Sequence, residues 1–201
     1  MSTKPLHWFT APLCLLALAS APTQAEPLGW DYASGSLLFL GKIDNGDSEN
    51  IDKGFRLDYA QSFNEHFFFR AKTELQEFDE VGADTAQVGV GGRLDLQTTI
   101  PVQLWGSFNY ERLSIGGVSD GFGVDIGIRS EVAPDFELGL TLKTANLSGA
   151  NSLDHDAIEL SGAYTGLADF DIIATVNNAS FDDDLEFDFD NIVGVGVRLN
   201  F

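Results

Sequence analysis

The sequence FDFDNIVGVGVRLNF, residues 187–201, alternates large apolar residues with polar or very small ones. Successive side chains of a β-strand point to opposite faces, so a period of two produces one apolar face and one polar face. The apolar face contains Phe187, Phe189, Val193, Val195, Val197, Leu199 and Phe201. The stretch therefore predicts a strand whose two faces meet different surroundings.

The same period recurs through most of the chain from Trp30 onward. It is found in segments 55–59, 67–74, 85–96, 102–111, 121–132, 135–145, 158–165 and 170–177. Segment 30–43 is similar, but its phase slips near residues 36–38, which predicts a β-bulge. Most of these segments approach the ~9–11 residues that a tilted strand needs to cross a bilayer. The pattern predicts an all-β, up-and-down antiparallel transmembrane β-barrel of about ten strands, with about eight as the alternative.

The connections between these segments alternate in length. Short turns are expected at residues 64, 97–100, 133–134 and 167–168, and longer polar loops at 44–53, 79–84, 114–120, 148–155 and 182–186. Short periplasmic turns and longer extracellular loops are typical of bacterial outer-membrane barrels, and an even strand number places both chain ends on the periplasmic side. Aromatic residues near strand ends are expected to form interfacial girdles: Trp30, Tyr32, Phe63, Tyr110, Tyr164 and Phe201.

Residues 1–25 have the features of a secretory signal peptide. Lys4 supplies a positive start, and residues 9–18 form an apolar run far shorter than the ~20 residues of a membrane-spanning helix. Cleavage is expected after Ala25, with Ala21 as the alternative. The predicted organisation is a signal peptide, 1–25, followed by an outer-membrane β-barrel, 26–201.

Cysteine usage and charge agree with export. Cys14 is the only cysteine, and Pro12 and Leu13 precede it in place of the small residues of a lipoprotein signal. The remaining chain has no thiol, which suits an oxidising compartment. The formal net charge of -20 excludes nucleic-acid binding through backbone phosphates. A hydrophobic content of 44%, with 16 Phe and 21 Gly, indicates an ordered, strand-rich protein despite this charge.

Charged residues of both signs gather on the polar strand face, together with many glycines. The predicted lumen charge network consists of Arg56, Asp58, Arg70, Lys72, Glu74, Arg93, Asp95, Glu111, Asp125, Arg129, Lys143, Glu159 and Arg198. Small residues and opposite charges suit a narrow interior, whereas large aliphatic residues suit lipid. A soluble barrel would reverse these faces; the signal peptide and the terminal pattern favour the membrane barrel. Bulky inward residues such as Phe68 and Trp105 predict a closed or very narrow lumen.

The final strand resembles that of the Gram-negative outer-membrane porin superfamily, because Val193 to Phe201 ends in an aromatic residue with apolar residues at every second position. The resemblance implies that the barrel-assembly machinery recognises Val197, Leu199 and Phe201. The whole chain after residue 25 is similar in pattern to the small OmpA/OmpX-like barrels. No periplasmic peptidoglycan-binding domain like that of OmpA is expected. The implied location is the outer membrane, crossed several times.

The predicted loops are strongly acidic, which suggests a metal site as one hypothesis. The candidate ligands for Ca²⁺ or Mg²⁺ are Asp44, Asp47, Glu49, Asp52, Asp182, Asp183, Asp184 and Glu186. Asp79, Glu80 and Asp84 add further acids in a second loop. Hard cations take carboxylate oxygens and would bridge these loops to lipopolysaccharide phosphates. The competing interpretation is a solvated, mutually repelling rim. No other cofactor is expected.

Asp154-His155-Asp156 is the one cluster with catalytic character. A general base needs a nucleophile or positioned water, and no partner lies at a recognisable spacing, so an ordinary loop histidine is the favoured reading. Three functions follow. The first is a non-enzymatic outer-membrane protein with a structural or narrow-pore role. The second is a binding module, either an adhesin or a subunit that docks a protein partner. The third, a membrane-embedded hydrolase, is the least favoured.

Overall fold

The computed structural model describes residues 28–44, 48–78, 81–96, 98–150, 152–183 and 187–201, with the side chains of 43–52, 81, 183 and 187 left undescribed. The predicted signal peptide lies outside these residues. The strands are β1 (Tyr32–Phe39), β2 (Lys42–Asp44), β3 (Ser48–Ser62), β4 (Phe67–Phe78), β5 (Val81–Leu96), β6 (Val102–Ser114), β7 (Val118–Ala133), β8 (Phe136–Gly149), β9 (Leu153–Tyr164), β10 (Asp171–Asp183) and β11 (Phe187–Asn200). Among the described residues, none belongs to a helix long and apolar enough to span a bilayer.

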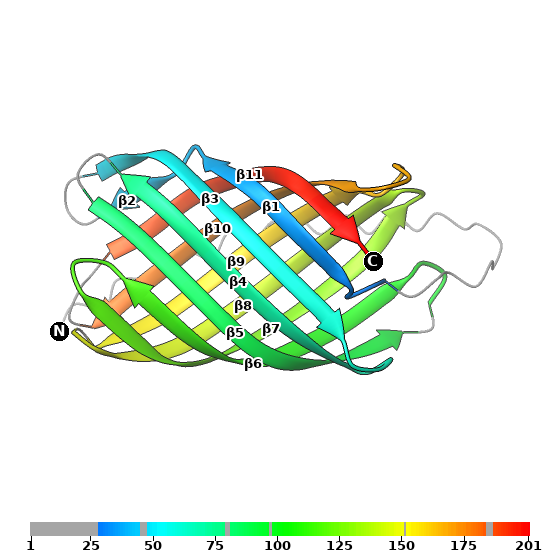
Figure 1. Cartoon of the computed structure of the whole chain (residues 1–201), viewed down its shortest axis with the longest axis horizontal. Helices are drawn as coiled ribbons and strands as arrows, with labels where there is room; N and C mark the ends of the chain where they lie inside the picture. Colours follow the sequence, from blue (N-terminus) through cyan, green and yellow to red (C-terminus); the bar gives the residue numbers. More distant parts are fainter. Residues whose placement is uncertain (1–27, 45–47, 79–80, 97, 151, 184–186) are drawn as a thin grey trace.

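The strands close into one antiparallel barrel, with neighbours in chain order throughout (Figure 1). β1 and β2 both pair with β11 on one side and β3 on the other, so they are two parts of one interrupted strand. The wall therefore has ten strands, and the prediction of a ten-stranded up-and-down barrel is confirmed. The start of β1 and the end of β11 lie together at the right-hand end in Figure 1. We take this end as periplasmic.

The interruption lies at Leu40, so the predicted bulge at residues 36–38 is wrong in position. Leu40 adopts a left-handed conformation with φ 54°, and alternation resumes with Gly41 facing inward. The position of the interruption cannot be read from the sequence, because Leu38 is apolar like the outward residues beside it. Its side chain nevertheless faces the interior and is 2% exposed. Left-handed backbone is rare for residues other than glycine and re-aims the residues that follow.

A second irregularity in β11 corrects the placement of Phe189. Asn191 has φ 52°, and the pairing of β10 with β11 shifts register there. Phe189 was expected on the same face as Val195, but it is 3% exposed and faces the interior, while Val195 is 42% exposed. The side chain of Phe187 lies outside the described residues. One residue beyond the strict period is enough to exchange the two faces.

Between these irregularities and the periplasmic end, the outer face carries a continuous band of large apolar side chains, as predicted. Its exposed members include Leu57, Val90, Leu94, Leu104, Phe108, Ile126, Leu138, Leu160 and Val197. Monomeric soluble proteins rarely expose so large a contiguous apolar surface, whereas a membrane barrel must. Two predicted girdle residues are corrected: Trp30 and Tyr32 are only 2% and 8% exposed, because their side chains point into the barrel.

The polarity of the wall reverses toward the end opposite the chain termini. In β8 the outward residues change from Leu138 and Leu142 to Asn146, while the inward residues change from Lys143 to Leu147. The same reversal gives the outer wall exposed acids, here called the acidic collar: Glu77, Asp84, Asp154, Asp156, Asp182, Asp188 and Asp190. This end has the polarity of a water-soluble β-barrel, so the hydrocarbon layer ends below the acidic collar.

The connections at the acidic end are shorter than predicted. Strands continue through most of the expected loops, leaving connections at 45–47, 79–80, 115–117, 150–152 and 184–186. β5 and β7 reach 16 residues each, beyond the ~9–11 needed to cross a bilayer. The polar residues of these segments were expected in loops. They are instead outward-facing residues of strands that extend beyond the hydrocarbon layer.

Candidate functional site

The lumen is the candidate site, because the strands direct a mixture of aromatic, charged and apolar side chains into it. From the periplasmic end to the acidic end these form an aromatic layer, a charged layer and an apolar layer. The alternation of each strand fixes which residues face inward, and the pairing of the strands fixes which of them meet.

The aromatic layer closes the periplasmic mouth. Trp30 stacks on Phe68 with ring centroids 3.8 Å apart and meets the edge of Trp105 at 5.1 Å. The Trp30 indole N–H donates to the Gln103 side chain, and the Arg129 guanidinium lies 5.1 Å from the Trp30 ring centroid. Gln103 and Arg129 also donate to the carbonyls of Leu28 and Gly29, which hold the N-terminal segment across the mouth.

The charged layer consists of ion pairs between strands that are distant in sequence. Glu159 accepts from both Arg56, at 2.9 Å, and Lys72, at 3.2 Å. Glu74 binds the same two cations at 2.9 and 2.8 Å. These four side chains are at most 17% exposed, so each charge is paired where water is scarce. Losing one member would leave a buried, unbalanced charge.

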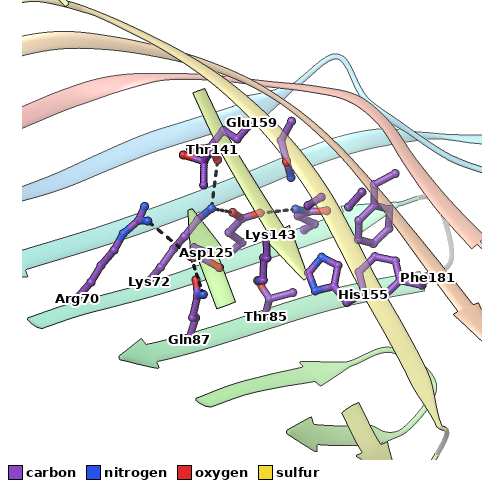
Figure 2. Close-up of a pocket in the computed structure, with 16 residues that line it drawn as sticks. Arg70, Lys72, Thr85, Gln87, Asp125, Thr141, Lys143, His155, Glu159 and Phe181 are labelled. Carbon is purple, nitrogen blue, oxygen red and sulfur yellow. Dashed lines mark hydrogen bonds and ion pairs between the residues drawn. The ribbon is translucent and has the colours of Figure 1, made fainter. Parts of the chain in front are cut away.

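Further pairs extend this layer in both directions. Arg70 binds Asp58 through Nε at 3.1 Å, and Gln87 donates to Asp125 at 2.9 Å. Figure 2 shows Arg70 and Gln87 both directed toward Asp125 from neighbouring strands. Toward the periplasm, the carboxylate of Glu137 accepts from Arg129 at 2.8 Å and from Arg198 at 3.0 Å, and Asp171 accepts from Arg198 at 2.7 Å.

Glu111 and His155 lie at the edge of the charged layer that adjoins the apolar layer. Glu111 is fully buried, binds Lys143 Nζ at 2.6 Å and lies 2.6 Å from His155 Nδ1. His155 is 5% exposed and stacks on Phe181 with centroids 4.2 Å apart. The predicted loop histidine is therefore an interior residue. Asp154 and Asp156 point outward, so strand alternation separates the apparent catalytic cluster.

The apolar layer seals the end that carries the acidic collar. Phe78 and Phe189 stack at 5.5 Å, and Phe181 meets the edge of Phe189 at 5.3 Å. The remaining members are Leu38, Ala83, Leu113, Ile115, Ala145, Leu147, Leu153, Ala179 and Ile192. Most are below 6% exposure, so their packing leaves no route for water among the described side chains of this layer.

Small cavities lie among the described side chains of the lumen. One of about 90 Å³ touches Tyr32, Arg56 and Arg198, and one of about 40 Å³ touches Lys143, His155 and Phe181 (Figure 2). A void of about 10–15 Å³ is enough to hold one water molecule, so each of these spaces has room for several waters.

Most residues of the predicted lumen network meet one another, but two do not reach it. Arg93 donates to the carbonyl of Glu65 at 2.9 Å in the β3–β4 turn. Asp95 accepts from Gln103 at 2.6 Å and is exposed at the periplasmic mouth. Both residues lie so close to the periplasmic end of β5 that their side chains do not reach the charged layer. Glu137, Asp171 and His155 join the ion pairs although they were absent from the predicted network.

The predicted metal ligands fall mainly where side chains are not described. Asp47, Asp184 and Glu186 lie outside the described residues, and the side chains of Asp44, Glu49, Asp52 and Asp183 are undescribed. Asp182 is exposed on the outer wall. Among the side chains that are described, no group of three or more His, Cys, Asp or Glu is arranged to hold a metal ion.

The residues of the predicted assembly signal all face outward from β11 and the chain end. Val197, Leu199 and Phe201 are 46%, 53% and 66% exposed. Phe201 stacks on Tyr59 with centroids 6.0 Å apart, and its amide donates to the Asp31 carbonyl at 3.0 Å. The last residue is thus fixed at the seam where β11 meets the first strand.

Comparison with solved structures finds several that are similar to this chain at low sequence identity. Neisserial surface protein A is 14% identical over 85% of this chain and 96% of its own, with a TM-score of 0.45. KdgM porin is 14% identical over 85% and 99%, with a TM-score of 0.42. The COG4313 outer membrane channel from Pseudomonas putida F1 is 10% identical over 91% and 100%, with a TM-score of 0.46.

Comparison with curated protein sequences finds no significant match. The family described as outer membrane protein beta-barrel domain matches residues 10–165, which is most of the chain. Together with the closed barrel and its lipid-facing band, this match establishes a multi-pass protein of the outer membrane. The chain belongs to the outer membrane protein beta-barrel domain family.

Proposed function

We propose that this protein is a closed, non-enzymatic outer-membrane barrel that serves as a structural element of the envelope and carries an acidic surface outside the membrane. The observation that supports this most is the lumen, which is filled at three successive levels. An ion entering from the periplasm would first meet Trp30 and Trp105, and then the ion pairs around Glu159. At the far end it would meet the rings of Phe181 and Phe189.

The interior also favours a non-enzymatic role. His155 is buried against Phe181 and bound to Glu111, so neither a lipid nor a peptide reaches its imidazole through the described wall. General-base catalysis needs the base within hydrogen-bonding reach of substrate. We expect His155→Ala to leave lipase and protease measurements at the background of the unaltered protein. Activity above background that disappears with His155 would contradict this assignment.

Conductance measurements in planar bilayers test the closed lumen. We expect the reconstituted barrel to give no discrete steps, because the described side chains of the apolar layer pack without a continuous aqueous path between them. Trp30→Ala removes one of the two indole rings of the periplasmic mouth and leaves the apolar layer intact, so this variant is expected to stay silent as well. Reproducible steps from the unaltered barrel, verified as folded by its shifted gel mobility before boiling, would overturn the proposal in favour of a narrow pore.

The acidic collar supports a second candidate, a binding platform for a cationic partner. Its carboxylates stand on the outer wall with few cations described beside them, chiefly Lys42, Lys53 and Arg112. Complementary charge increases association rates, and salt screens it. We expect a basic peptide to bind detergent-purified barrel at low ionic strength and to dissociate above physiological salt. Equal binding at both ionic strengths would remove the electrostatic platform.

Two further predictions concern partners. A Ca²⁺ or Mg²⁺ ion between the acidic connections and lipopolysaccharide remains a proposal. Calorimetric titration with Ca²⁺ at physiological salt should release or absorb heat, and no heat would end this proposal.

We also propose that the barrel-assembly machinery recognises the terminal residue. Phe201→Ala should lower the folded fraction in the outer membrane of cells while leaving refolding from urea intact, and normal assembly would contradict this.

A further inference from the structure

Residues 28–31, here called the strap, precede β1 at the periplasmic mouth, at the right-hand end in Figure 1. One end of the strap is fixed at the seam of the barrel. The Asp31 carboxylate accepts from the Ser62 amide at 2.7 Å, and the Asp31 carbonyl accepts from the Phe201 amide at 3.0 Å. Asp31 therefore anchors the strap to the wall beside the chain end.

The other end of the strap is held by the opposite wall. Gln103 of β6 donates to the Leu28 carbonyl at 3.2 Å, and Arg129 of β7 donates to the Gly29 carbonyl at 3.1 Å. In the order of the ten-stranded wall, β6 and β7 lie across the lumen from β1. These two contacts recognise backbone carbonyls, so they do not depend on the side chains of residues 28 and 29.

The side chain of Trp30 gives the strap its specificity. Trp30 is 2% exposed, stacks on Phe68, meets the edge of Trp105 and lies beside the Arg129 guanidinium. Stacked and edge-on rings attract one another beyond their buried area, and a guanidinium is attracted to the face of an indole. The mouth therefore binds an aromatic ring together with the two carbonyls that precede it.

The strap is separable from the barrel that holds it. Release of residues 28–30 would break no strand pairing, since the pairing of β1 with β11 and β3 begins at Tyr32. Chain termini that belong to no strand open locally at lower cost than the strands themselves. A cavity of about 90 Å³ lies against Trp30, Trp105 and Arg129, so the strap leaves part of the space beside its ring unfilled. The strap thus has the position of a ligand of the wall.

We propose that the periplasmic mouth is a docking site for an extended peptide segment with an aromatic residue, which the strap occupies until a periplasmic protein supplies such a segment. The ring of the partner segment lies between Phe68 and Trp105, and its two preceding carbonyls accept from Gln103 and Arg129. The strap competes for the same contacts within one chain. Exchange leaves the apolar layer in place, so it does not open the lumen.

A capped synthetic peptide of residues 28–31, with a fluorinated indole, tests the site by fluorine NMR on the full barrel in detergent. Trp30→Ala empties the site and should bind the peptide saturably. The unaltered barrel should bind it about tenfold more weakly, because the strap competes at an effective concentration on the order of millimolar. Equal binding to both barrels would overturn the proposal, and so would no binding to a Trp30→Ala barrel shown to be folded.

A second pair of variants separates the docking contacts from general effects at the mouth. Added to Trp30→Ala, Arg129→Ala should weaken peptide binding about tenfold, because it removes contacts with both the ring and the preceding carbonyl. Arg93→Ala is the matched control, since Arg93 donates to the Glu65 carbonyl. It should leave peptide affinity unchanged. Equal losses in the two variants would contradict the assigned contacts.

A nitroxide on Gly29→Cys follows the strap with Trp30 intact. Among the described residues, no heavy atom lies within 4 Å of the Cβ position at Gly29, so a label there does not disturb packing. The label should be immobilised at rest and become mobile with excess peptide, and continued immobilisation at saturating peptide would contradict exchange. A dimer of the unaltered barrel in ultracentrifugation that Trp30→Ala abolishes would assign the site to a second copy and overturn a separate partner.

Discussion

Glu111 illustrates how single residues hold the lumen together. Its carboxylate is fully buried between Lys143 and His155, and no other carboxylate among the described residues forms an ion pair with Lys143. The ion pairs of the charged layer fill the lumen as well as balancing charge. A buried pair contributes little compared with well-packed apolar residues, but half of a pair is strongly destabilising.

We therefore expect Glu111→Ala to lower the free energy of unfolding by about 3–5 kcal/mol, because Lys143 would remain buried without its anion. Asp156→Ala, which removes an exposed carboxylate from the acidic collar, should change it by less than about 0.5 kcal/mol. Urea unfolding in detergent micelles measures both. A double variant, Glu111→Leu with Lys143→Met, should recover most of the loss. Similar small effects in the two single variants would show that the charged layer does not support the barrel.

Sequence reasoning identified the inward residues better than their partners. Alternation placed Arg56, Lys72 and Glu159 on one face, because facing follows from parity along a strand. Their mutual contacts depend on register between strands that are far apart in the sequence, which periodicity does not fix. His155 was missed as an interior residue because the acids on either side of it suggested a loop.

At the scale of the elements, two left-handed residues control which face each strand tip presents. Leu40 divides β1 from β2, and Asn191 lies opposite in the neighbouring strand β11. Phe189 and Ile192, on either side of Asn191, both face inward and belong to the apolar layer. Asparagine tolerates this conformation, whereas leucine is strained in it. The phase slip was visible in the sequence, but a run of four apolar residues concealed its position.

Leu40→Gly is expected to stabilise the barrel by about 1 kcal/mol, because glycine adopts the left-handed conformation without the strain of a Cβ. The side chain is 70% exposed, so its removal leaves no cavity. Phe39→Gly is the matched control: the neighbouring residue has ordinary strand geometry, and glycine there should destabilise. Refolding equilibria in phospholipid vesicles compare them. A loss of stability in Leu40→Gly equal to that of the control would argue against strain at this position.

At the scale of the whole molecule, the barrel has two parts with opposite polarity. The part toward the periplasmic end is apolar outside and charged within, and the part toward the acidic end is acidic outside and apolar within. Periodicity predicted the ten strands and the part toward the periplasmic end, because lipid contact imposes a strong pattern. It did not predict the part toward the acidic end, because the sequence of a strand with a polar outer face in water resembles that of a loop.

The loss of stability caused by an outward arginine should therefore depend on its position along the barrel axis. Leu160→Arg, in the apolar band of β9, is expected to lower stability by about 2–4 kcal/mol, as for a charge near the bilayer midplane. Ser148→Arg, exposed near the acidic end of β8, should change it by about 0–1 kcal/mol. Unfolding in phospholipid vesicles gives both values. Equal penalties at the two positions would place the edge of the hydrocarbon layer elsewhere.

Site-directed spin labelling along β8 tests the polarity reversal most directly, since the chain after residue 25 contains no native cysteine. Single cysteines at Leu138, Leu142, Asn146 and Ser148 carry a nitroxide in barrels reconstituted into vesicles. We expect labels at 138 and 142 to relax with oxygen dissolved in lipid, and labels at 146 and 148 to relax with a water-soluble nickel chelate. Chelate access at all four positions would contradict the membrane assignment, and oxygen access at all four would contradict the reversal.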